Sequence, residues 1–468
     1  MIRDSNMATS CMQATDLELL GSAARRAVAY LQSVGGRRVA PDAAAVRELE
    51  QLTGDLPGQA AEPFELMEIL DRIGSPATVA TAGGRYFGFV IGGALPSAVA
   101  AAWLVSAWDQ NGSLRVMSPV SAALEDTALG WVRDLLRLPA ECGGALVTGA
   151  TMANFTGLAA ARHELLERAG WDVESDGLSG APPLTVVVGD EMHVALTKAL
   201  GMLGLGRKRV VRVPVDGQGR MRPGELPPLD RRTLVCIQAG NVNTGAFDPA
   251  RETCARAGDA GAWVHVDGAF GLWAAASPKY RHLTDGFELA DSWATDAHKW
   301  PNVGYDCGIA LVRHPSALRA AMAVGAAYLA PGDRREPSHY TPEMSRRARG
   351  VELWAALRSL GRNGLAELVD RTCGYAQRFA EGLREAGYEI LNDVAINQVL
   401  ASFGSAEVTR SVIERVQREG TCWCGGTEWQ GRVAMRISVS SWATTAEDVE
   451  ASLAAILRIA GDAVRNPA

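Results

Sequence analysis

The sequence predicts an α/β protein with a mostly parallel sheet covered by helices on both faces, followed by a small C-terminal α+β domain. Two observations predict this fold class. Short apolar runs, typical of buried strands, alternate with segments of helical period between residues 145 and 312. After residue 345 the pattern changes to long amphipathic helices with isolated strands, which indicates a second, smaller unit.

The N-terminal region, residues 15–75, is predicted to form helices separated by loops, because prolines and glycines interrupt its apolar pattern. It is too short and too broken to be a separate enzyme, so we expect it to pack as an arm on another surface. Residues 86–108 carry no formal charge and are long enough to span a bilayer. Gly92, Gly93 and Pro96 interrupt this stretch, which favours a buried loop leading into a core or interface helix over a membrane span.

Seven apolar runs are the candidate strands of the large sheet. They are residues 145–147, 184–188, 209–213, 234–238, 263–266, 292–295 and 309–312. Segments of helical period, the first at residues 122–138, lie before and between most of them. Because ligands of such sheets bind beyond the carboxyl ends of the strands, the polar residues that follow each strand are the first candidates for a site.

The C-terminal region is predicted to contain two amphipathic helices, a short segment without an assigned element, a helix, a strand and a final helix. In chain order these are residues 345–368, 372–385, 397–403, 406–419, 432–440 and a segment that begins near Thr445. The pattern places an N-terminal arm at residues 1–80, a large domain at residues 81–345 and a small domain at residues 346–468.

The formal net charge of −7, with both signs mixed along the chain, argues against nucleic acid as the main partner. Residues 1–20 lack the continuous apolar segment of a secretory signal. Eight cysteines are scattered along the chain, and Cys422 and Cys424 have no second Cys or His pair at metal-binding spacing. We therefore expect reduced thiols, no metal site, no membrane partner and a cytoplasmic location.

One of only four lysines, Lys299, lies between a histidine and a tryptophan and follows an apparent strand. Arginine, which supplies nearly all other basic positions, cannot lose its proton and therefore cannot act as an amine nucleophile. Lysine can do so when burial or a neighbouring positive charge lowers its pKa. Lys299 is thus a candidate Schiff-base residue, and an ordinary surface lysine is the alternative.

Three further strand ends carry polar groups. Asp267 ends an apolar strand and, together with Lys299 at the next strand end, would flank one ligand; a buried structural salt bridge is the alternative. Residues 148–154 join a strand to a helix, where backbone N–H groups and the helix dipole suit a phosphate, although a plain helix cap explains them as often. His193 follows a third strand, where a satisfied core histidine is the alternative.

Taken together, these groups match the needs of pyridoxal 5'-phosphate (PLP). This cofactor requires a lysine for the Schiff base, a carboxylate at the ring nitrogen, donors for the phosphate and a group against the ring face. Asp267 would keep the ring nitrogen protonated, since two unit charges about 4 Å apart gain about 4 kcal/mol at an effective dielectric of about 20. The protonated ring accepts electrons from a carbanion formed at the substrate Cα.

The motifs resemble those of the group II pyridoxal-phosphate-dependent decarboxylases, which include the aromatic-L-amino-acid, tyrosine and glutamate decarboxylases. The similarity covers about residues 15–455. It rests on Tyr86-Phe87-Gly88-Phe89, Ser118-Pro119 with Glu125, Trp131, His265-Val266-Asp267, Ala290-Asp291-Ser292, His298-Lys299-Trp300 and Ser345-Arg346-Arg347. It implies the PLP-dependent transferase fold type I (aspartate aminotransferase-like) with a seven-stranded sheet. It also implies an obligate homodimer with active sites at the interface, in which the arm packs on the partner subunit.

The resemblance further implies roles for single residues. Lys299 resembles the Schiff-base lysine, Asp267 the partner of the pyridine nitrogen, and His193 the catalytic histidine stacked on the ring. The other cofactor contacts that it implies are Ala150, Thr151, His298, Ala269 and Asn241. Tyr340 is the candidate for the loop tyrosine that protonates the quinonoid intermediate from the other subunit after carbon dioxide leaves.

The chain departs from the family pattern at several positions. Residues 240–242 are Gly-Asn-Val where the family usually has Gly-Thr-Thr, Met152 replaces an acid, and Val194-Ala195 replaces Ser-Ser. The segment between Tyr328 and Arg346 is shorter than in the animal aromatic decarboxylases. Because Lys299, Asp267 and His193 are all present, the cofactor is expected, while these departures leave the fate of the quinonoid open.

The predicted function is PLP-dependent decarboxylation of an L-amino acid to its amine. Apolar and aromatic pocket walls are expected from Tyr86, Phe87, Phe89 and Trp108, which favours an aromatic or hydrophobic substrate over glutamate. The alternatives with the same cofactor are transamination, decarboxylation-dependent oxidative deamination and C–C cleavage. A PLP-binding regulator without catalysis is more remote, since the sequence shows no helix-turn-helix or basic region.

Overall fold

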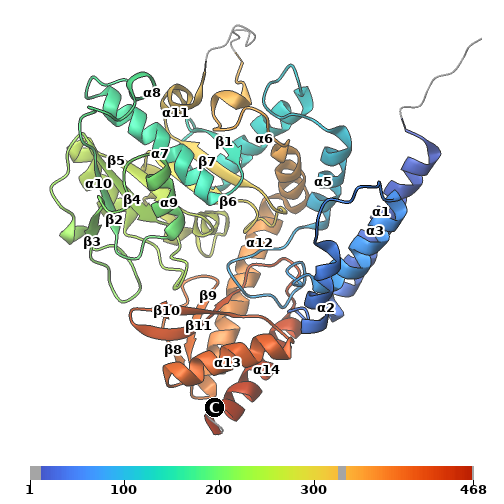
Figure 1. The fold of residues 1–468 in the computed structure, drawn as a ribbon. Coiled ribbons are helices and arrows are strands. Elements are labelled where there is room, and N and C mark those ends of the chain that lie inside the picture. Colours follow the sequence, from blue (N-terminus) through green and yellow to red (C-terminus); the bar gives the residue numbers. More distant parts are fainter. Residues whose placement is uncertain (1–11, 325–333, 466–468) are drawn as a thin grey trace, which may run out of the picture.

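The computed structural model describes residues 12–324 and 334–465 of the chain, and its larger part is built on a seven-stranded sheet (Figure 1). The strand order is β1-β7-β6-β5-β4-β2-β3, and all neighbours are parallel except β7, which runs antiparallel to both β1 and β6. The strands are β1 (Gly143–Val147), β2 (Thr185–Gly189), β3 (Val211–Val213), β4 (Thr233–Gln238), β5 (Trp263–Asp267), β6 (Ser292–Asp296) and β7 (Gly308–Val312). The mostly parallel seven-stranded sheet is confirmed, with strand ends within two residues of the predicted ones.

Helices cover both faces of this sheet because successive residues of each buried strand point to opposite sides. In β4, Val235 and Ile237 join an apolar cluster with α6 and α10, whereas Leu234 and Cys236 join a second cluster with α7 and α9. The helices around the sheet are α5 (Pro96–Trp108), α6 (Pro119–Leu135), α7 (Ala150–Glu167), α8 (Val173–Asp176), α9 (Val194–Met202), α10 (Ala250–Ala260) and α11 (Pro315–Met322).

A smaller antiparallel sheet follows in the order β10-β11-β9-β8. Its strands are β8 (Glu389–Ile390), β9 (Gln398–Ser402), β10 (Gly425–Trp429) and β11 (Arg432–Ser438), and its helices are α12 (Arg349–Glu385), α13 (Ala406–Glu419) and α14 (Ala446–Arg465). Two helices were predicted where the structure has α12. Two helical stretches are present within α12, but they meet at a kink at Gly361 (φ 61°) and not between residues 368 and 372 as predicted. The short strand β10 was not predicted, because a Gly-Gly start and polar residues hide its period.

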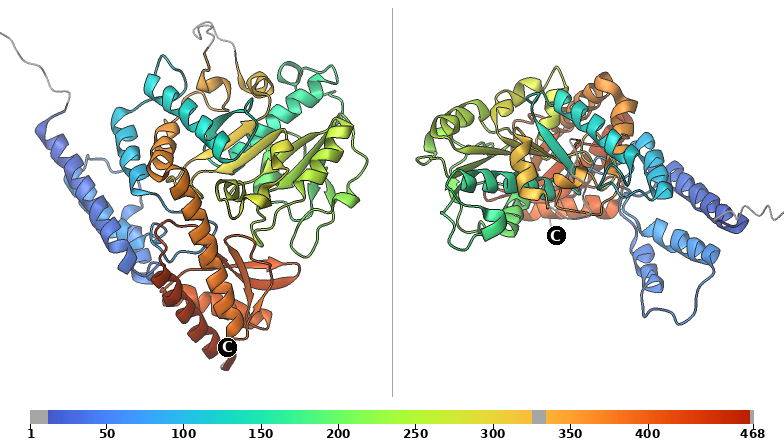
Figure 2. Two further views of the ribbon diagram at one scale, coloured as in Figure 1. Left: turned by 180° about the vertical axis from the view of Figure 1, so that it is seen from behind. Right: turned by 90° about the horizontal axis from the view of Figure 1, so that it is seen from above.

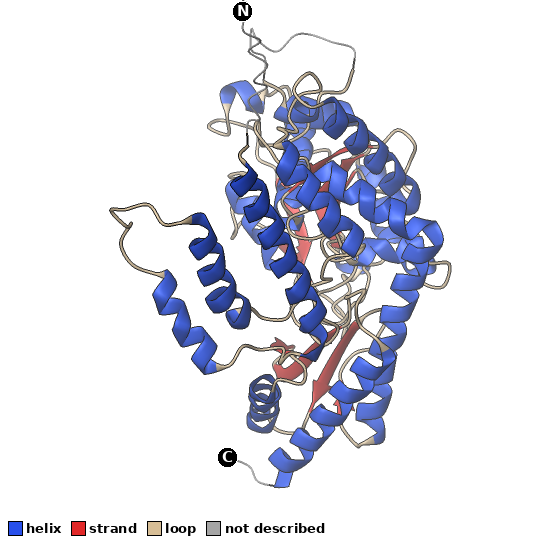
Figure 3. Cartoon of the chain, turned by 90° about the vertical axis from the view of Figure 1, so that its right-hand side faces the viewer, coloured by secondary structure: helices blue, strands red, loops and turns tan. Residues whose placement is uncertain are grey.

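The N-terminal segment forms α1 (Ala14–Ser33), α2 (Ala43–Glu48), α3 (Pro63–Ile69) and α4 (Ser75–Ala77). Helices α1 and α3 lie side by side along the edge of the molecule, and the loop that links α2 to α3 projects away from the body (Figures 2 and 3). None of the residues of α1 is buried. Within the described ranges, no helix combines the length and apolar character needed to cross a bilayer.

Candidate active site

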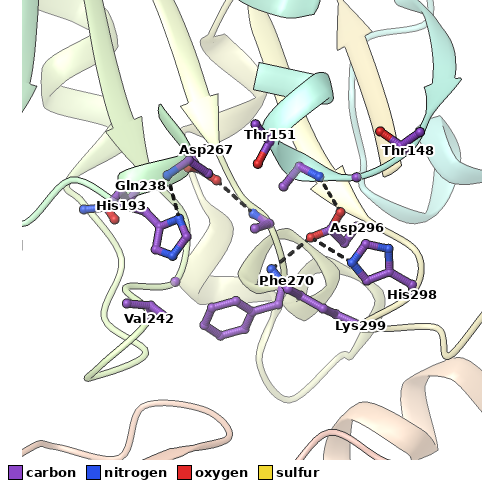
Figure 4. A pocket seen from close by; sticks show the side chains of 15 residues that line it. Thr148, Thr151, His193, Gln238, Val242, Asp267, Phe270, Asp296, His298 and Lys299 are labelled. Atoms are coloured by element: carbon purple, nitrogen blue, oxygen red, sulfur yellow. Dashed lines mark hydrogen bonds and ion pairs between the residues drawn. The ribbon is translucent and has the colours of Figure 1, made fainter. Parts of the chain in front are cut away.

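A cavity of about 290 Å³ opens at the carboxyl ends of β4, β5 and β6, beside the first residues of α7 (Figure 4). This is the edge of the sheet at which the strand pattern places ligands. Seven of the eight predicted cofactor contacts line it: Lys299, Asp267, His193, Ala150, Thr151, His298 and Ala269. Residues that are far apart in the sequence therefore meet around one space.

The side chain of Lys299 forms an ion pair with Asp296, the last residue of β6. Lys299 Nζ lies 2.9 Å from Asp296 Oδ2, and His298 Nε2 lies 3.5 Å from the same oxygen. Asp296 Oδ1 accepts the backbone N–H of Ala150 at 2.6 Å (Figure 4). Asp296 is 2% exposed and was missed by the sequence interpretation, although it ends an apolar strand in the segment that contains Lys299.

Asp267 ends β5, which pairs in parallel with β6. Its Oδ1 accepts the backbone N–H of Ala269 at 3.3 Å, and its Oδ2 accepts the amide of Asn154 at 3.1 Å. Among the described residues Asp267 has no ion pair, so the alternative of a structural salt bridge between Asp267 and Lys299 is not what the structure shows. A 5% exposed carboxylate that faces the cavity without a cation is suited to a positively charged group of a ligand.

His193 caps the N-terminus of α9. Its Nδ1 accepts the backbone N–H of Ala195 at 3.2 Å, so in the neutral ring the proton is assigned to Nε2. Burial lowers the pKa of His193, which keeps the ring neutral near physiological pH. Because the ring lines the cavity, His193 is not the core histidine of the alternative interpretation.

Ala150 and Thr151 are the first two residues of α7, where backbone N–H groups without partners inside the helix favour an anion. The loop that leads into the helix lies close to β7. A Cβ on Gly308 would come within 2.4 Å of the Gly149 Cα, so this approach requires glycine. His298 flanks the same end of the cavity, its ring centroid 4.3 Å from that of Tyr305, and burial lowers its pKa.

Asn241 lies outside the cavity. Its Oδ1 accepts the backbone N–H groups of Asn243 at 2.9 Å and of Thr244 at 3.2 Å, which closes a turn, and its Nδ2 has no partner among the described residues. The neighbouring residues Gly240 and Val242 line the cavity instead.

The four predicted substrate-pocket residues do not line the cavity of this chain. Phe87 as a wall is wrong, because its fully buried ring packs in the core of the small domain, 5.1 Å from Phe379. Tyr86 and Phe89 stack on Trp423 with ring centroids 5.1 Å and 5.5 Å away. Trp108 ends α5 and is 40% exposed.

Tyr340 is likewise away from the cavity of its own chain. Its ring lies under the guanidinium of Arg335, whose Cζ is 4.9 Å from the ring centroid. It packs against the apolar cluster that includes α11. Tyr328, the other tyrosine of the shortened segment, falls outside the described residues.

Arg436, in the middle of β11, is a residue that the sequence interpretation missed. Its Nη1 lies 3.4 Å from both the Val242 carbonyl oxygen and Asn243 Oδ1. It makes no ion pair with any carboxylate of the described chain, and burial lowers its pKa. It is close enough to influence the pKa of His193. The only signal in the sequence is a single cation inside an apolar strand.

The pyridoxal-dependent decarboxylase conserved domain matches residues 77–403. The chain belongs to this family. It is 30% identical over 368 residues to the aromatic-L-amino-acid decarboxylase of Drosophila lebanonensis, covering 72% of this chain and 88% of that protein. It is 28% identical over 342 residues to the 4-hydroxyphenylacetaldehyde synthase of Rhodiola rosea, covering 68% of each.

The fold of this pyridoxal-dependent decarboxylase is shared with solved structures. The crystal structure of Oryza sativa TDC with PLP and tryptamine superposes with a TM-score of 0.88 at 24% identity, over 97% of this chain and 99% of the other. The protein is therefore a fold type I enzyme, a PLP-dependent carboxy-lyase that acts on an amino acid. The predicted family, fold class, cofactor and reaction class are confirmed.

The cavity fits this cofactor by its donor set. The N-terminus of α7 offers backbone N–H groups and the Thr151 hydroxyl at one end, and Asp267 offers an uncompensated carboxylate at the other. Lys299 supplies an amine on the same cavity. These are the groups that a phosphate, a protonated pyridine nitrogen and an aldehyde require.

Proposed function

We propose that the protein decarboxylates an aromatic or other hydrophobic L-amino acid to its amine. The observation that carries the proposal is the meeting of Lys299, Asp267 and His193 on one cavity whose wall includes Phe270 and Val242. PLP supplies the conjugated ring that takes up the electrons of the bond to the carboxylate. The protein supplies the groups that hold the cofactor and orient the substrate.

The chain's own residues divide these tasks. Lys299 holds the cofactor through Nζ, and Asp267 provides the negative charge that keeps the ring nitrogen protonated. Ala150 and Thr151 donate to the phosphate. His193 packs on the ring and carries a proton at Nε2. Ala269 and His298 complete the contacts, and Asn241 positions the turn from which Gly240 and Val242 reach the cavity.

Arg436 holds the substrate carboxylate in this proposal. It is a mostly buried guanidinium with only two long hydrogen bonds, so a carboxylate supplies what it lacks. Arg436 itself does not line the cavity but contacts Val242, which does. The basic side chains that line the cavity are Lys299 and two histidines whose pKa values are lowered by burial. No further cation of the described cavity lining is left for the side chain of an acidic amino acid, which favours an apolar substrate.

The arm supports a homodimer. Helix α1 buries no residue, and apolar side chains gather on the arm, on α5 and on the loop before α6. They include Leu17, Leu20, Phe64, Leu66, Trp103, Leu104, Trp108, Val116 and Met117. So much exposed apolar surface is typical of an interface. The partner subunit would also bring Tyr86, Phe89, Trp108 and Tyr340 within reach of a neighbouring site.

A cytoplasmic location is part of the proposal. It fits the cysteines of the described chain, which are buried and form no disulfide.

Incubation of the purified enzyme with a panel of L-amino acids tests the reaction. Release of carbon dioxide with one amine per turnover from tryptophan, tyrosine, phenylalanine or leucine is expected, with less from glutamate and aspartate. Lys299→Ala is expected to abolish the visible absorbance of the covalently held cofactor. Absence of carbon dioxide from every amino acid would refute the proposed reaction.

Decarboxylation-dependent oxidative deamination to an aldehyde is the second candidate. It is favoured by the likeness to the 4-hydroxyphenylacetaldehyde synthase. If Tyr340 of one subunit donates the proton in the other, Tyr340→Phe shifts the products from the amine to the aldehyde, ammonia and hydrogen peroxide, with dioxygen as the oxidant and water as the source of the aldehyde oxygen. An aldehyde as the main product of the unaltered enzyme establishes the second candidate instead.

A further inference from the structure

Behind Asp267, four buried side chains form one continuous chain of hydrogen bonds that leads away from the cavity. The indole Nε1 of Trp263 is 2.9 Å from Ser292 Oγ, which is 2.8 Å from His265 Nδ1. His265 Nε2 is 2.8 Å from Asn154 Oδ1, and Asn154 Nδ2 is 3.1 Å from Asp267 Oδ2. We call Trp263, Ser292, His265 and Asn154 the relay. Each of its side chains is at most 2% exposed.

Three elements assemble the relay. His265 and Asp267 are two residues apart on β5 and so point to the same face of the sheet, and Ser292 pairs with His265 from β6. Asn154 comes from α7, which packs across this face. Gly157, one turn along the helix, allows the close approach, because a Cβ there would lie 2.9 Å from His265 Cε1.

The direction of every bond in the relay follows from its two ends. The indole N–H of Trp263 can only donate, so Ser292 Oγ accepts it and has its own proton free for His265 Nδ1. At the other end the Asp267 carboxylate can only accept, so Asn154 presents its NH₂ to Asp267 and its oxygen to His265.

His265 must then carry its proton on Nε2 and leave Nδ1 bare. Full burial lowers its pKa to about 3, so the ring stays neutral and the second proton is absent. All four donors are aimed toward Asp267. In a low-dielectric interior, hydrogen bonds aligned in this way polarise one another.

We propose that the relay is a positioning device for the Asp267 carboxylate, which holds it ionised and fixes its plane toward the ring nitrogen of the cofactor. Asn154 and His265 act through Asp267 and do not themselves touch the cofactor. The inference rests on the proposed role of Asp267 at the ring nitrogen. It adds the reason why a carboxylate without a cation partner among the described residues is stable: the aligned donors stabilise its charge.

The bond directions are tested without cofactor, by NMR of the cofactor-free protein with nitrogen-15 histidine. The signal that His265→Gln removes identifies His265. A neutral ring with the proton on Nε2, unchanged between about pH 5 and about pH 8, is expected. A proton on Nδ1, or a charged ring in this range, overturns the inference and leaves the proposed function untouched.

The influence on the cofactor is tested by nitrogen-15 NMR of protein reconstituted with PLP labelled at the ring nitrogen. In Asn154→Leu and His265→Phe, the ring nitrogen is expected to lose its proton at a pH about one unit lower than in the unaltered protein, a tenfold change in equilibrium. His265→Gln, whose amide can donate from the place of Nε2, is expected to restore most of the shift. A purely structural role of His265 predicts no such rescue.

Because replacement of a fully buried histidine can also lower stability, a matched pair of tryptophan variants supplies an independent test. Trp263→Phe removes the first donor of the relay. Trp293→Phe removes an equally buried indole N–H that donates to the Phe287 carbonyl oxygen at 2.8 Å, outside the relay. Trp263→Phe is expected to move the protonation of the ring nitrogen in the same direction as Asn154→Leu, and Trp293→Phe to leave it unchanged.

Two outcomes separate failure of this inference from failure of the proposed function. If Asp267→Asn changes the protonation of the ring nitrogen while Asn154→Leu, His265→Phe and Trp263→Phe do not, the relay has no role and the function stands. If Lys299→Ala keeps the visible absorbance and Asp267→Asn leaves the ring nitrogen unaffected, the cofactor does not sit in this cavity and both proposals are wrong.

Discussion

Asp296 Oδ1 accepts the backbone N–H of Ala150 at 2.6 Å, so a carboxylate of this chain occupies the helix N-terminus that the proposed site offers to a phosphate. The same carboxylate pairs with Lys299 at 2.9 Å. Asp296 thus satisfies both the anion-binding end of α7 and the amine. Binding of PLP requires that these interactions be shared or exchanged.

Asp296→Asn removes the charge and keeps the shape. We expect the affinity of the cofactor-free protein for inorganic phosphate and for PLP to rise about tenfold, because a like charge no longer faces the phosphate. The free energy of unfolding without cofactor is expected to fall by about 1–2 kcal/mol, since Lys299 loses its ion pair. Thermal shift with phosphate and absorbance titration with PLP measure the two effects.

The control for this prediction is Asp462→Asn, which makes the same charge change on the exposed surface of α14. It is expected to change neither affinity by more than about twofold. An Asp296→Asn protein that binds phosphate no better than the unaltered protein would contradict the competition between the carboxylate and the phosphate.

Arg436→Met is expected to weaken the binding of the amino acid and to leave the binding of the amine product nearly unchanged. The substitution keeps an apolar stem and removes the charge that we assign to the substrate carboxylate, a group that the amine lacks. A 10- to 100-fold higher KM for the amino acid is expected. Inhibition constants of the amine and of a substrate analogue with a carboxylate provide the comparison, and an equal loss for both would remove Arg436 from this role.

We expect protonation of His193 to cause the loss of kcat/KM on the acid side of its pH profile. Burial lowers its pKa below the ordinary value, so the ring becomes charged only as the pH falls through that lower value. The proposed contact with the cofactor ring uses the neutral form, and kcat/KM is therefore expected to decline only at a pH lower than the ordinary histidine pKa of about 6.5.

His193→Gln tests this assignment because it cannot titrate. We expect kcat to fall about 10²- to 10³-fold, in the range of a lost acid–base or orienting group. The acid limb should be absent from the remaining kcat/KM profile. Retention of the limb in the variant would show that another group, such as His298, causes it.

The sequence was sufficient to predict that Asp267 and Lys299 lie close together, because strand ends of a parallel sheet meet at one edge. Asp267 and Lys299 each follow a recognisable apolar strand, so their positions along the chain already placed them on neighbouring strand ends. The alternation of strand and helix also predicted both layers of the large domain. The residues that the sequence predicted are those whose position is set by the end of the strand or helix in which they lie.

The missed contacts depend on packing between distant segments. The bond between Ala150 and Asp296 joins residues 146 positions apart, and nothing in either local pattern indicates it. Arg436 contacts Val242, a residue of the cavity wall, only because β11 packs beside residues 242–243. Phe87 shows the converse, since an aromatic residue in an uncharged segment can enter either core, and here it enters that of the small domain.

The exposed apolar surface of α5 leads to the last prediction, which concerns assembly. Trp103 and Leu104 are 43% and 52% exposed, and their neighbours on the same helix, Ala101 and Val105, are buried. In the proposed homodimer both exposed side chains are covered by the partner subunit, so a charge at these positions would be desolvated without a partner. The double substitution Trp103→Glu, Leu104→Glu is therefore expected to yield monomers in light scattering coupled to gel filtration, with loss of activity if the partner completes the site.

Leu289→Glu, at a side chain of similar exposure (45%) in the turn before β6, is the matched control and is expected to remain dimeric and active. A monomeric unaltered protein with full activity would contradict the proposed homodimer. It would also show that Tyr340 of a second subunit is not needed for the reaction.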